Sequence, residues 1–320
     1  MYERFYGLRE RPFDLTPNPR YLFLTAKHRE ALSNLQYGIS ARRGVTLLIG
    51  EAGTGKTTLV RTVLESEERR KTRCVYMNNP MLTRGEFIEF LANAFDLGEH
   101  AASSKTRLLA DLERVLRERR AEGVTTALFV DEAQALPLEL LEEVRLLANI
   151  ETDTEKLLQL VLAGQPHLAA KLNDPDLRQL KQRVALRCEL RPLDLKETTA
   201  YIMRRVQIAG GDSMPFTREA VELIHECGRG IPRTISVICD NALVSGFAAD
   251  QRPVGYALVH EVCADFDFNP PLTPSRVVAR APATVPPPAM APRAGAATGS
   301  DASQAELFKV FTRPRRFSLF

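Results

Sequence analysis

A glycine-rich loop between an apolar run and a helical segment constrains this chain more than any other feature of its sequence. Val45-Thr-Leu-Leu-Ile49 leads into Gly50-Glu-Ala-Gly-Thr-Gly-Lys-Thr57, and helical periodicity follows from about Lys56 to Glu68. Glycines suit such a loop because backbone N–H groups can then close around phosphate oxygens without intervening Cβ atoms. The strand before it and the helix after it favour this P-loop interpretation over a chance match in a Gly/Thr-rich turn. The pattern predicts a nucleotide site formed by Gly50, Glu51, Ala52, Gly53, Thr54, Gly55, Lys56, Thr57 and Thr58.

Two residues at the end of the loop have the chemistry that a nucleoside triphosphate requires. Lys56 offers a point charge to the β- and γ-phosphates, and the hydroxyl of Thr57 is a ligand for Mg²⁺. The helix that begins here adds the positive end of its dipole. We therefore expect ATP and Mg²⁺ as cofactors.

Up to about residue 192, the rest of the chain repeats this alternation of apolar runs and helical segments. Helical periodicity is expected at 27–42, 86–95, 108–119 and 138–147. Apolar runs at 74–77, 127–130 and 157–163 predict further buried strands, and the more alternating run 184–190 predicts an edge strand. This order predicts an α/β fold with a doubly wound parallel sheet, which binds ligands at the carboxyl ends of its strands.

The second half of the chain changes character twice. From about Leu193 the strands stop, and four helices are expected at 196–209, 217–227, 232–247 and 256–263. Beyond Asp265 the composition is rich in proline and alanine, which cannot bury enough apolar surface to offset the entropy of ordering. We therefore predict an N-terminal segment and helix packing on the core at 1–42, an α/β domain at 43–192, a small all-helical domain at 193–264 and a disordered tail at 265–320.

Charge and cysteine content exclude several classes of protein. Residues 1–264 hold 36 Lys/Arg and 36 Asp/Glu, so the folded part has no net basic charge that would predict binding to DNA. The five cysteines form no Cys-x-x-Cys pair, which argues against a metal cluster and suits a reducing compartment. No signal peptide or membrane-spanning stretch is recognised, so a cytoplasmic location is expected.

Three polar residues after two apolar runs are candidates for hydrolysis. Ala127-Leu-Phe-Val130 delivers Asp131 and Glu132 to a strand end, where Asp131 is expected to hold Mg²⁺ and Glu132 to orient and deprotonate the attacking water. Gln165 ends the run Leu160-Val-Leu-Ala-Gly-Gln165 and is a candidate for placing that water. The alternative for Gln165 is a loop residue that caps the helix opened by Pro166.

Three arginines are candidates for stabilising charge on the γ-phosphate. Arg178 and Arg183 lie on a short helix before the last expected strand, and Arg233 begins a helix of the second domain. An arginine close to the γ-phosphate accelerates other NTPases by roughly 10³–10⁵. Each of them alone reads as a surface arginine, and their order after the P-loop and the Asp-Glu pair favours the functional role.

The order of these motifs resembles that of AAA+ ATPases, and more closely that of the ExeA family of general secretion pathway protein A ATPases. The resemblance covers residues 1–264 and is carried by Phe5-Tyr-Gly-Leu-Arg-Glu-Arg-Pro-Phe13, Leu15-Thr-Pro-Asn-Pro-Arg-Tyr-Leu22, His28, Asp131-Glu-Ala-Gln134, Glu151-Thr-Asp-Thr-Glu-Lys-Leu-Leu158 and Val161-Leu-Ala-Gly-Gln-Pro-His167. It implies that Gln165 is sensor 1, that Arg233 is sensor 2 in a helical lid, and that Arg183 or Arg178 is an arginine finger for a neighbouring subunit. A finger in trans implies a homo-oligomer. The resemblance also places His28 and the segment before it near the adenine, with a plain core role as the alternative for its aromatic residues.

The family resemblance predicts an ATP-hydrolysing enzyme that powers or regulates assembly of a secretion or cell-envelope complex. ExeA-like proteins continue into a transmembrane helix and a peptidoglycan-binding domain, which we do not recognise here. The aromatic and basic run Leu307–Phe320 is expected either to dock on an envelope partner or an anionic surface at the inner membrane, or to be a frayed end. The alternative functions are a DNA-associated AAA+ ATPase similar to regulators of transposition or replication initiation, a non-hydrolysing nucleotide switch, and a helicase.

Overall fold

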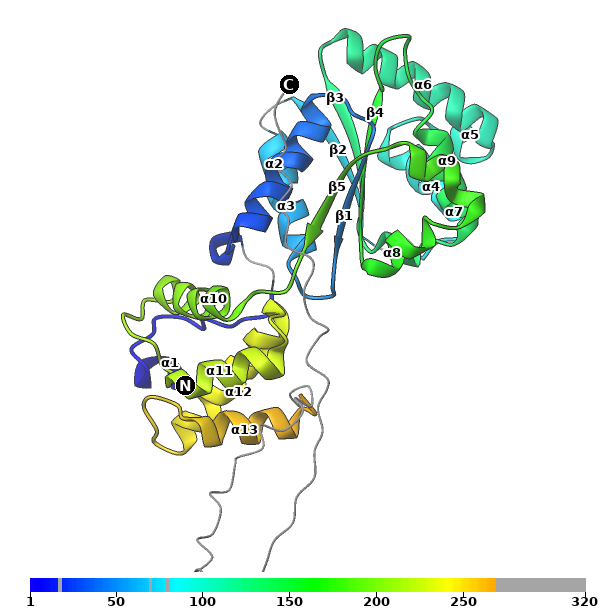
Figure 1. Cartoon of the computed structure of the whole chain (residues 1–320). Helices are drawn as coiled ribbons and strands as arrows, with labels where there is room; N and C mark the ends of the chain where they lie inside the picture. The colour runs from blue at the N-terminus through cyan, green and yellow to red at the C-terminus, as the bar shows by residue number, and fades with distance from the viewer. Residues whose placement is uncertain (17–18, 69–70, 79–80, 269–320) are drawn as a thin grey trace, which may run out of the picture. The chain divides into compact units, whose positions relative to one another are not determined.

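The computed structural model of the chain describes residues 1–16, 19–68, 71–78 and 81–268 (Figure 1). Except for residues 265–268, the predicted disordered tail lies outside the described residues.

A five-stranded parallel sheet forms the first part of the fold. Its strands are β1 (Val45–Gly50), β2 (Thr72–Met77), β3 (Thr125–Val130), β4 (Leu158–Gly164) and β5 (Val184–Leu190), in the order β2-β3-β4-β1-β5. The prediction of a doubly wound parallel α/β sheet is confirmed. β5 lies at the edge, as its alternating sequence indicates, whereas every residue of β1 and β4 is buried.

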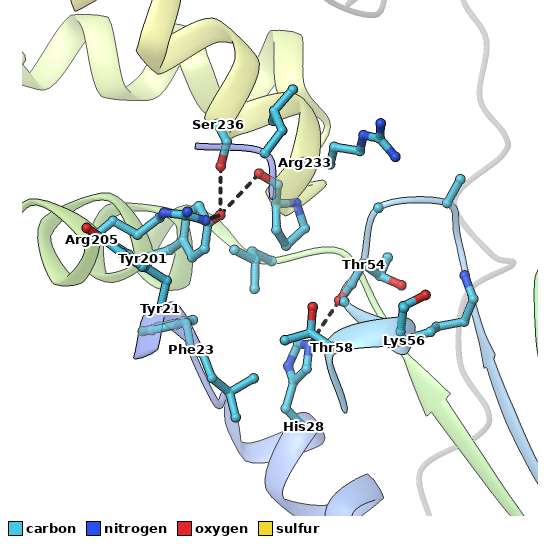
Figure 2. Close-up of a pocket in the computed structure, with 18 of the residues that line it drawn as sticks. Tyr21, Phe23, His28, Thr54, Lys56, Thr58, Tyr201, Arg205, Arg233 and Ser236 are labelled. Atoms are coloured by element: carbon cyan, nitrogen blue, oxygen red, sulfur yellow. Dashed lines mark hydrogen bonds between the residues drawn. The ribbon is translucent and has the colours of Figure 1, made fainter. Parts of the chain in front are cut away.

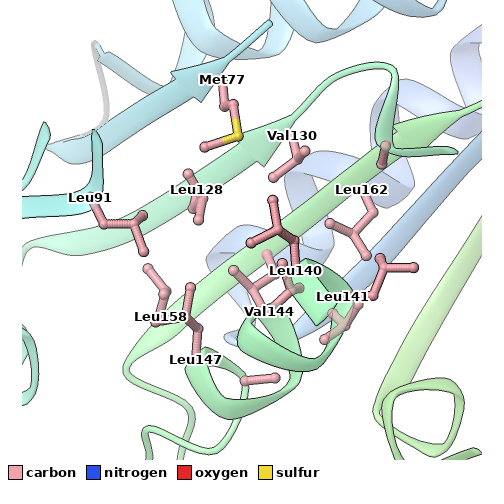
Figure 3. Close-up of a cluster of buried hydrophobic side chains, with 14 of the residues drawn as sticks. Met77, Leu91, Leu128, Val130, Leu140, Leu141, Val144, Leu147, Leu158 and Leu162 are labelled. Atoms are coloured by element: carbon pink, nitrogen blue, oxygen red, sulfur yellow. The ribbon is translucent and has the colours of Figure 1, made fainter. Parts of the chain in front are cut away.

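Alternate residues of the strands supply two apolar layers, one on each face of the sheet. Leu48 points to the layer that contains α2 (Ala26–Ser40) and α3 (Lys56–Glu68), which cover one face. Its neighbours Leu47 and Ile49 point to the opposite layer, where Leu128 and Leu140 meet (Figure 3). The helices of this second face are α4 (Arg84–Ala94), α5 (Glu99–Ala102), α6 (Lys105–Ala121), α7 (Leu138–Leu147), α8 (Pro166–Lys171) and α9 (Arg178–Gln182), and Figure 1 shows them together on that side.

Strand register brings the functional strand ends together. Ile49 pairs with Gly164, and Val130 pairs with Leu162, so β1, β3 and β4 end at the same edge of the sheet. Parallel strands place their carboxyl ends on one side, and β4 separates the strand that precedes the P-loop from the strand that precedes Asp131.

Four helices follow the sheet and form the helical domain. They are α10 (Leu195–Ile208), α11 (Arg218–Gly228), α12 (Pro232–Ala248) and α13 (Tyr256–Asp265). Local sequence sets where they begin: Asp194 and Glu197 form a capping box before α10, and Pro232 occupies the first turn of α12. Throughout the described ranges, every helix is too short or too polar to pass through a bilayer.

Of the N-terminal segment and helix predicted at 1–42, the first residues pack on the helical domain. Helix α1 (Tyr2–Phe5) and the residues after it bury Tyr2, Tyr6, Leu8 and Phe13 in one apolar cluster with α10–α13. The backbone N–H of Arg9 donates to the carbonyl of Ala209 at 2.7 Å. Large aromatic side chains from the start of the chain therefore enlarge the apolar core that the four helices form. Within the first 42 residues, α2 is the helix that packs on the sheet.

Candidate active site

The P-loop joins β1 to α3 and takes a conformation that its glycines permit. Gly53 and Gly55 have φ angles of +83° and +99°, which lie in the region where side chains are strained. A Cβ atom on Gly53 would lie 2.7 Å from Cβ of Arg233, so this glycine also allows the helical domain to approach the loop closely. The backbone N–H of Arg233 donates to the carbonyl of Gly53 at 3.3 Å.

Lys56 is buried under the loop, with 4% of its surface exposed. Its ammonium donates to the carbonyl oxygens of Gly50 at 2.9 Å and Glu51 at 3.1 Å. Burial lowers the pKa of Lys56, while the carboxylates of Glu132, Asp131 and Glu51 oppose that shift. The cation is therefore held among acceptors at the edge of a cavity, where a phosphate group is a better partner than neutral carbonyls.

Asp131 is buried at the end of β3 and accepts hydrogen bonds on both carboxylate oxygens. Its Oδ2 accepts from the hydroxyl of Thr57 at 2.7 Å and from the phenol of Tyr76 at 3.0 Å, and its Oδ1 accepts from the N–H of Glu132 at 2.9 Å. Burial, followed by the charge of Asp131, raises the pKa of Tyr76 to about 12, so this phenol remains a donor at neutral pH. Sequence reasoning missed Tyr76, since nothing local to Thr72–Met77 distinguishes it from a residue of the sheet.

The Thr57 hydroxyl and the Asp131 carboxylate fit the requirements of Mg²⁺. This ion prefers oxygen ligands and is commonly held by one or two protein groups together with substrate phosphates and water. The two side chains lie within 2.7 Å of one another beside the P-loop, where phosphate oxygens would complete the ligand set.

Glu132 lies at the cavity wall and is contacted by two glutamine side chains. Its backbone has a φ of 51°, an unusual left-handed conformation for a residue with a side chain. The amide Nε2 atoms of Gln134 and Gln165 both donate to its Oε2, the latter at 3.4 Å. The structure thus brings the predicted Gln165 to Glu132. Gln134 was recognised in the sequence only as part of the Asp131–Gln134 family motif, without a role.

A cavity of about 450 Å³ lies beside the P-loop and extends away from it between the N-terminal segment and the helical domain (Figure 2). Its walls come from four parts of the chain: the N-terminal segment with His28, the P-loop, Glu132, and the helical domain. The wall residues that belong neither to the P-loop nor to the end of β3 are Asp14, Leu15, Thr16, Tyr21, Leu22, Phe23, His28, Leu193, Tyr201, Arg205, Pro232, Arg233 and Ser236. An elongated nucleotide with a charged and an apolar end fits such a composite wall.

Arg205 connects the N-terminal segment to α10 at the far end of this cavity. Its guanidinium donates to the carbonyls of Pro12 and Asp14, the latter at 3.0 Å, and to the hydroxyl of Tyr201 at 2.7 Å. It also lies over the ring of Tyr21, 4.8 Å from the centroid. The fork geometry of arginine suits several simultaneous acceptors. Sequence reasoning missed Arg205 because the two carbonyls that it bonds are more than 190 positions away.

The structure places the three predicted arginines in two locations. Arg233 lines the cavity at the start of α12, beside the P-loop. Arg178 is exposed at the start of α9, and Arg183 is half-buried just after its end. Neither of these two described arginines lines the cavity of its own chain.

The sequence of the chain matches a family model and a curated protein. Residues 39–172 match the family model described as AAA domain. General secretion pathway protein A of Aeromonas hydrophila is 43% identical over 255 residues, which are 79% of this chain and 46% of that protein. The chain therefore spans about half the length of this curated relative.

Two solved structures of Aeropyrum pernix proteins share the fold at low identity. The ORC2 protein of Aeropyrum pernix, solved as ADPNP and ADP complexes, has a TM-score of 0.57 and 18% identity, covering 80% of this chain and 71% of its own. The ORC1 protein of the same organism, solved in complex with DNA, has a TM-score of 0.59 and 19% identity, covering 81% and 70%. These likenesses concern the fold alone.

Proposed function

The chain belongs to the AAA+ ATPases of the ExeA (general secretion pathway protein A) family, and we propose that it hydrolyses ATP in the cavity between P-loop, N-terminal segment and helical domain. One observation carries the proposal. The carboxylate-bearing Glu132 lines the same cavity as Lys56 and Thr57, at the end of the strand that also presents Asp131. A phosphate-binding cation, a metal-ligand pair and a base are thus assembled around one space.

In the proposed binding mode, the phosphates of ATP lie on the P-loop, and the adenine ring lies toward the N-terminal segment. Lys56 exchanges its carbonyl partners for the β- and γ-phosphates, and the glycine-rich backbone supplies N–H donors. The cavity continues from there to His28, Phe23 and Tyr201, which supply apolar and aromatic surface for a purine ring (Figure 2). The structure of the ORC2 protein of Aeropyrum pernix was solved with ADPNP and ADP, which supports nucleotide binding by this fold.

In the proposed hydrolysis, Glu132 orients a water molecule and takes its proton as the water attacks the γ-phosphate. Gln165 holds the carboxylate of Glu132, and Arg233 places positive charge at the phosphate end of the cavity. Thr57 and Asp131 would hold Mg²⁺, which when bound neutralises charge on the phosphate oxygens.

A second subunit completes the proposed site. Because neither Arg183 nor Arg178 lines the cavity of its own chain, we assign one of them to the γ-phosphate of a neighbouring copy. The chain then acts as a homo-oligomer. The name of the Aeromonas hydrophila relative supports a role in powering or regulating assembly of a secretion or cell-envelope complex, in the cytoplasm or at the inner membrane.

Steady-state phosphate release and nucleotide binding test the hydrolytic proposal together. We expect turnover by the wild-type protein with Mg²⁺ and its loss on chelation with EDTA. Lys56→Ala is expected to lose ATP affinity, whereas Glu132→Gln is expected to bind ATP and to hydrolyse it at least about 100-fold more slowly, as for removal of a general base. Glu139→Gln, the same change at an exposed glutamate of α7, is the matched control. Wild-type protein without turnover at concentrations that permit oligomerisation would refute the proposal.

A further inference from the structure

The side chain of Gln134 uses both ends of its amide at the active site. Gln134 lies in a single 3₁₀ turn, Ala133–Ala135, directly after Glu132. Its Oε1 accepts from the backbone N–H of Gln165 at 3.0 Å, and its Nε2 donates to Oε2 of Glu132. One amide therefore connects the end of β4 to the carboxylate proposed as the base.

The end of β4 has the shape that this contact needs. Gly164 is the last residue of β4, and a Cβ atom there would lie 2.8 Å from Oε1 of Gln134. Because the glycine leaves this space free, the Gln134 side chain can reach the N–H of Gln165, which is the first backbone donor beyond the strand. The close approach indicates a fitted contact between the ends of β3 and β4 rather than a side chain resting on the surface.

The same contact acts on a side chain that needs to be oriented. Glu132 is half-exposed and has a long, flexible side chain, so its free carboxylate would sample many orientations. The amides of Gln134 and Gln165 both donate their hydrogen bonds to Oε2. Fixing one oxygen in this way restricts the carboxylate and leaves the other oxygen available to accept a proton from water.

We propose that Gln134 is a positioning residue for ATP hydrolysis, which holds the carboxylate of Glu132 in place and ties it to the end of β4. The proposal rests on the hydrolytic function proposed above. It assigns to Gln134 an effect on turnover and none on ATP binding, because Gln134 does not line the cavity.

Two substitutions separate the two ends of the amide. Gln134→Met keeps the length of the side chain and removes both hydrogen bonds. Gln134→Glu keeps an oxygen that accepts from the N–H of Gln165, but it cannot donate to Glu132 when ionised and places a second negative charge beside it. If Gln134 only holds the end of β4, Gln134→Glu should keep the wild-type kcat. If Gln134 positions Glu132, both variants should lower kcat.

The experiment measures kcat and KM for ATP together with affinity for a fluorescent ATP analogue. We expect both variants to lower kcat by about 10- to 100-fold, less than the roughly 10²–10⁴-fold that a general acid–base group itself contributes, with analogue affinity within about twofold of wild type. Gln207→Met, at an exposed position of α10, is the matched control. In a Glu132→Gln background, Gln134→Met is expected to cause no further loss, since residues that act as a unit are non-additive.

Three outcomes would overturn the positioning role. The first is a wild-type kcat in Gln134→Met. The second is a wild-type kcat in Gln134→Glu together with a lowered kcat in Gln134→Met. The third is that the losses of kcat caused by Gln134→Met and Glu132→Gln add fully in the double variant. A wild-type protein without turnover would overturn the hydrolytic function itself, so the two failures are distinguishable.

Discussion

The imidazole Nε2 of His28 lies 3.0 Å from the carbonyl oxygen of Thr54 (Figure 2). This hydrogen bond connects α2, the first long helix of the chain, to the P-loop. A carbonyl accepts only, so Nε2 carries the proton that is donated. In the neutral ring Nδ1 then accepts from the hydroxyl of Thr25 at 2.8 Å, and the same hydroxyl oxygen accepts from the N–H of His28 as the helix cap. The loop conformation is therefore supported from a residue that also lines the cavity.

Replacing His28 by phenylalanine tests this support. His28→Phe keeps a flat ring but leaves the Thr54 carbonyl without its donor, so we expect ATP affinity to fall by about 5- to 10-fold, the equivalent of roughly one hydrogen bond. Titration with a fluorescent ATP analogue measures the change. His260→Phe, at an exposed ring on α13, is the control and is expected to bind as wild type does. Equal affinities in all three proteins would contradict the support.

Arg205→Lys tests whether the guanidinium fork joins the N-terminal segment to α10. Lysine retains the charge but cannot bond two carbonyls and the Tyr201 hydroxyl in one plane, so we expect a loss of roughly 2 kcal/mol in stability. We also expect weaker ATP binding, because the joined segments form the cavity wall. Thermal unfolding and nucleotide titration measure both effects. The neighbouring exposed Arg204 allows Arg204→Lys as the control, and indistinguishable melting temperatures would argue against this role.

The proposed arginine finger predicts complementation between two inactive proteins. Arg183→Ala is expected to bind ATP normally and to lose turnover, while Lys56→Ala lacks ATP binding but retains its arginine. Mixing them should restore part of the phosphate release, because one subunit then supplies the pocket and the other the arginine. The same mixture made with Arg178→Ala shows which arginine acts. No recovery at any mixing ratio for either arginine would refute a finger in trans.

Glu155 predicts an acid-dependent loss of stability far from the active site. It accepts hydrogen bonds from Arg120 and, at 2.6 Å, from Arg42, and these two partners hold its pKa below the ordinary value. A folded-state pKa below the unfolded value of about 4.3 stabilises the fold above that value, and the contribution is lost as the pH falls through the folded pKa.

Urea unfolding of wild type and Glu155→Gln at several pH values measures this contribution. We expect the variant to be less stable near pH 7 and the gap to close progressively in acid below about pH 4. Glu113→Gln, which breaks an exposed pair with Arg117, is expected to change stability by less than about 1 kcal/mol. A gap that persists unchanged in strong acid would show that the effect of Glu155 is not electrostatic.

Local patterns were sufficient to predict the strands of the sheet and its longer helices, but not the short helix α5. Each buried strand is a short apolar run, and the alternation in Val184–Leu190 marked it as the edge. The beginning of β2 was missed because Thr72 and Arg73 are polar. Thr72 is nevertheless buried, and its hydroxyl donates to Glu67 at 2.9 Å, a contact that hydrophobic periodicity cannot reveal.

Contacts between residues that are distant in the sequence were not predictable in this way. Gln134 stands in a quoted motif, yet its partner N–H lies 31 positions away at the end of another strand. Arg204 and Arg205 are consecutive arginines in the sequence, and only the folded N-terminal segment distinguishes them. Glu132 and Lys56 followed from motifs because the P-loop and the strand-end carboxylates have chemistry that is visible locally.

The packing of the N-terminal segment on the helical domain has a consequence for the order in which the chain folds. The phenol of Tyr2 donates to the carboxylate of Asp240, 238 positions later. During synthesis the aromatic residues of the N-terminal segment leave the ribosome long before the helices that bury them. They therefore stay exposed to solvent while the strands of the sheet, which lie between these two parts in the sequence, are synthesised. Because Pro232, Arg233 and Ser236 of α12 belong to the cavity wall, we expect the nascent chain to bind nucleotide only after α12 has left the ribosome.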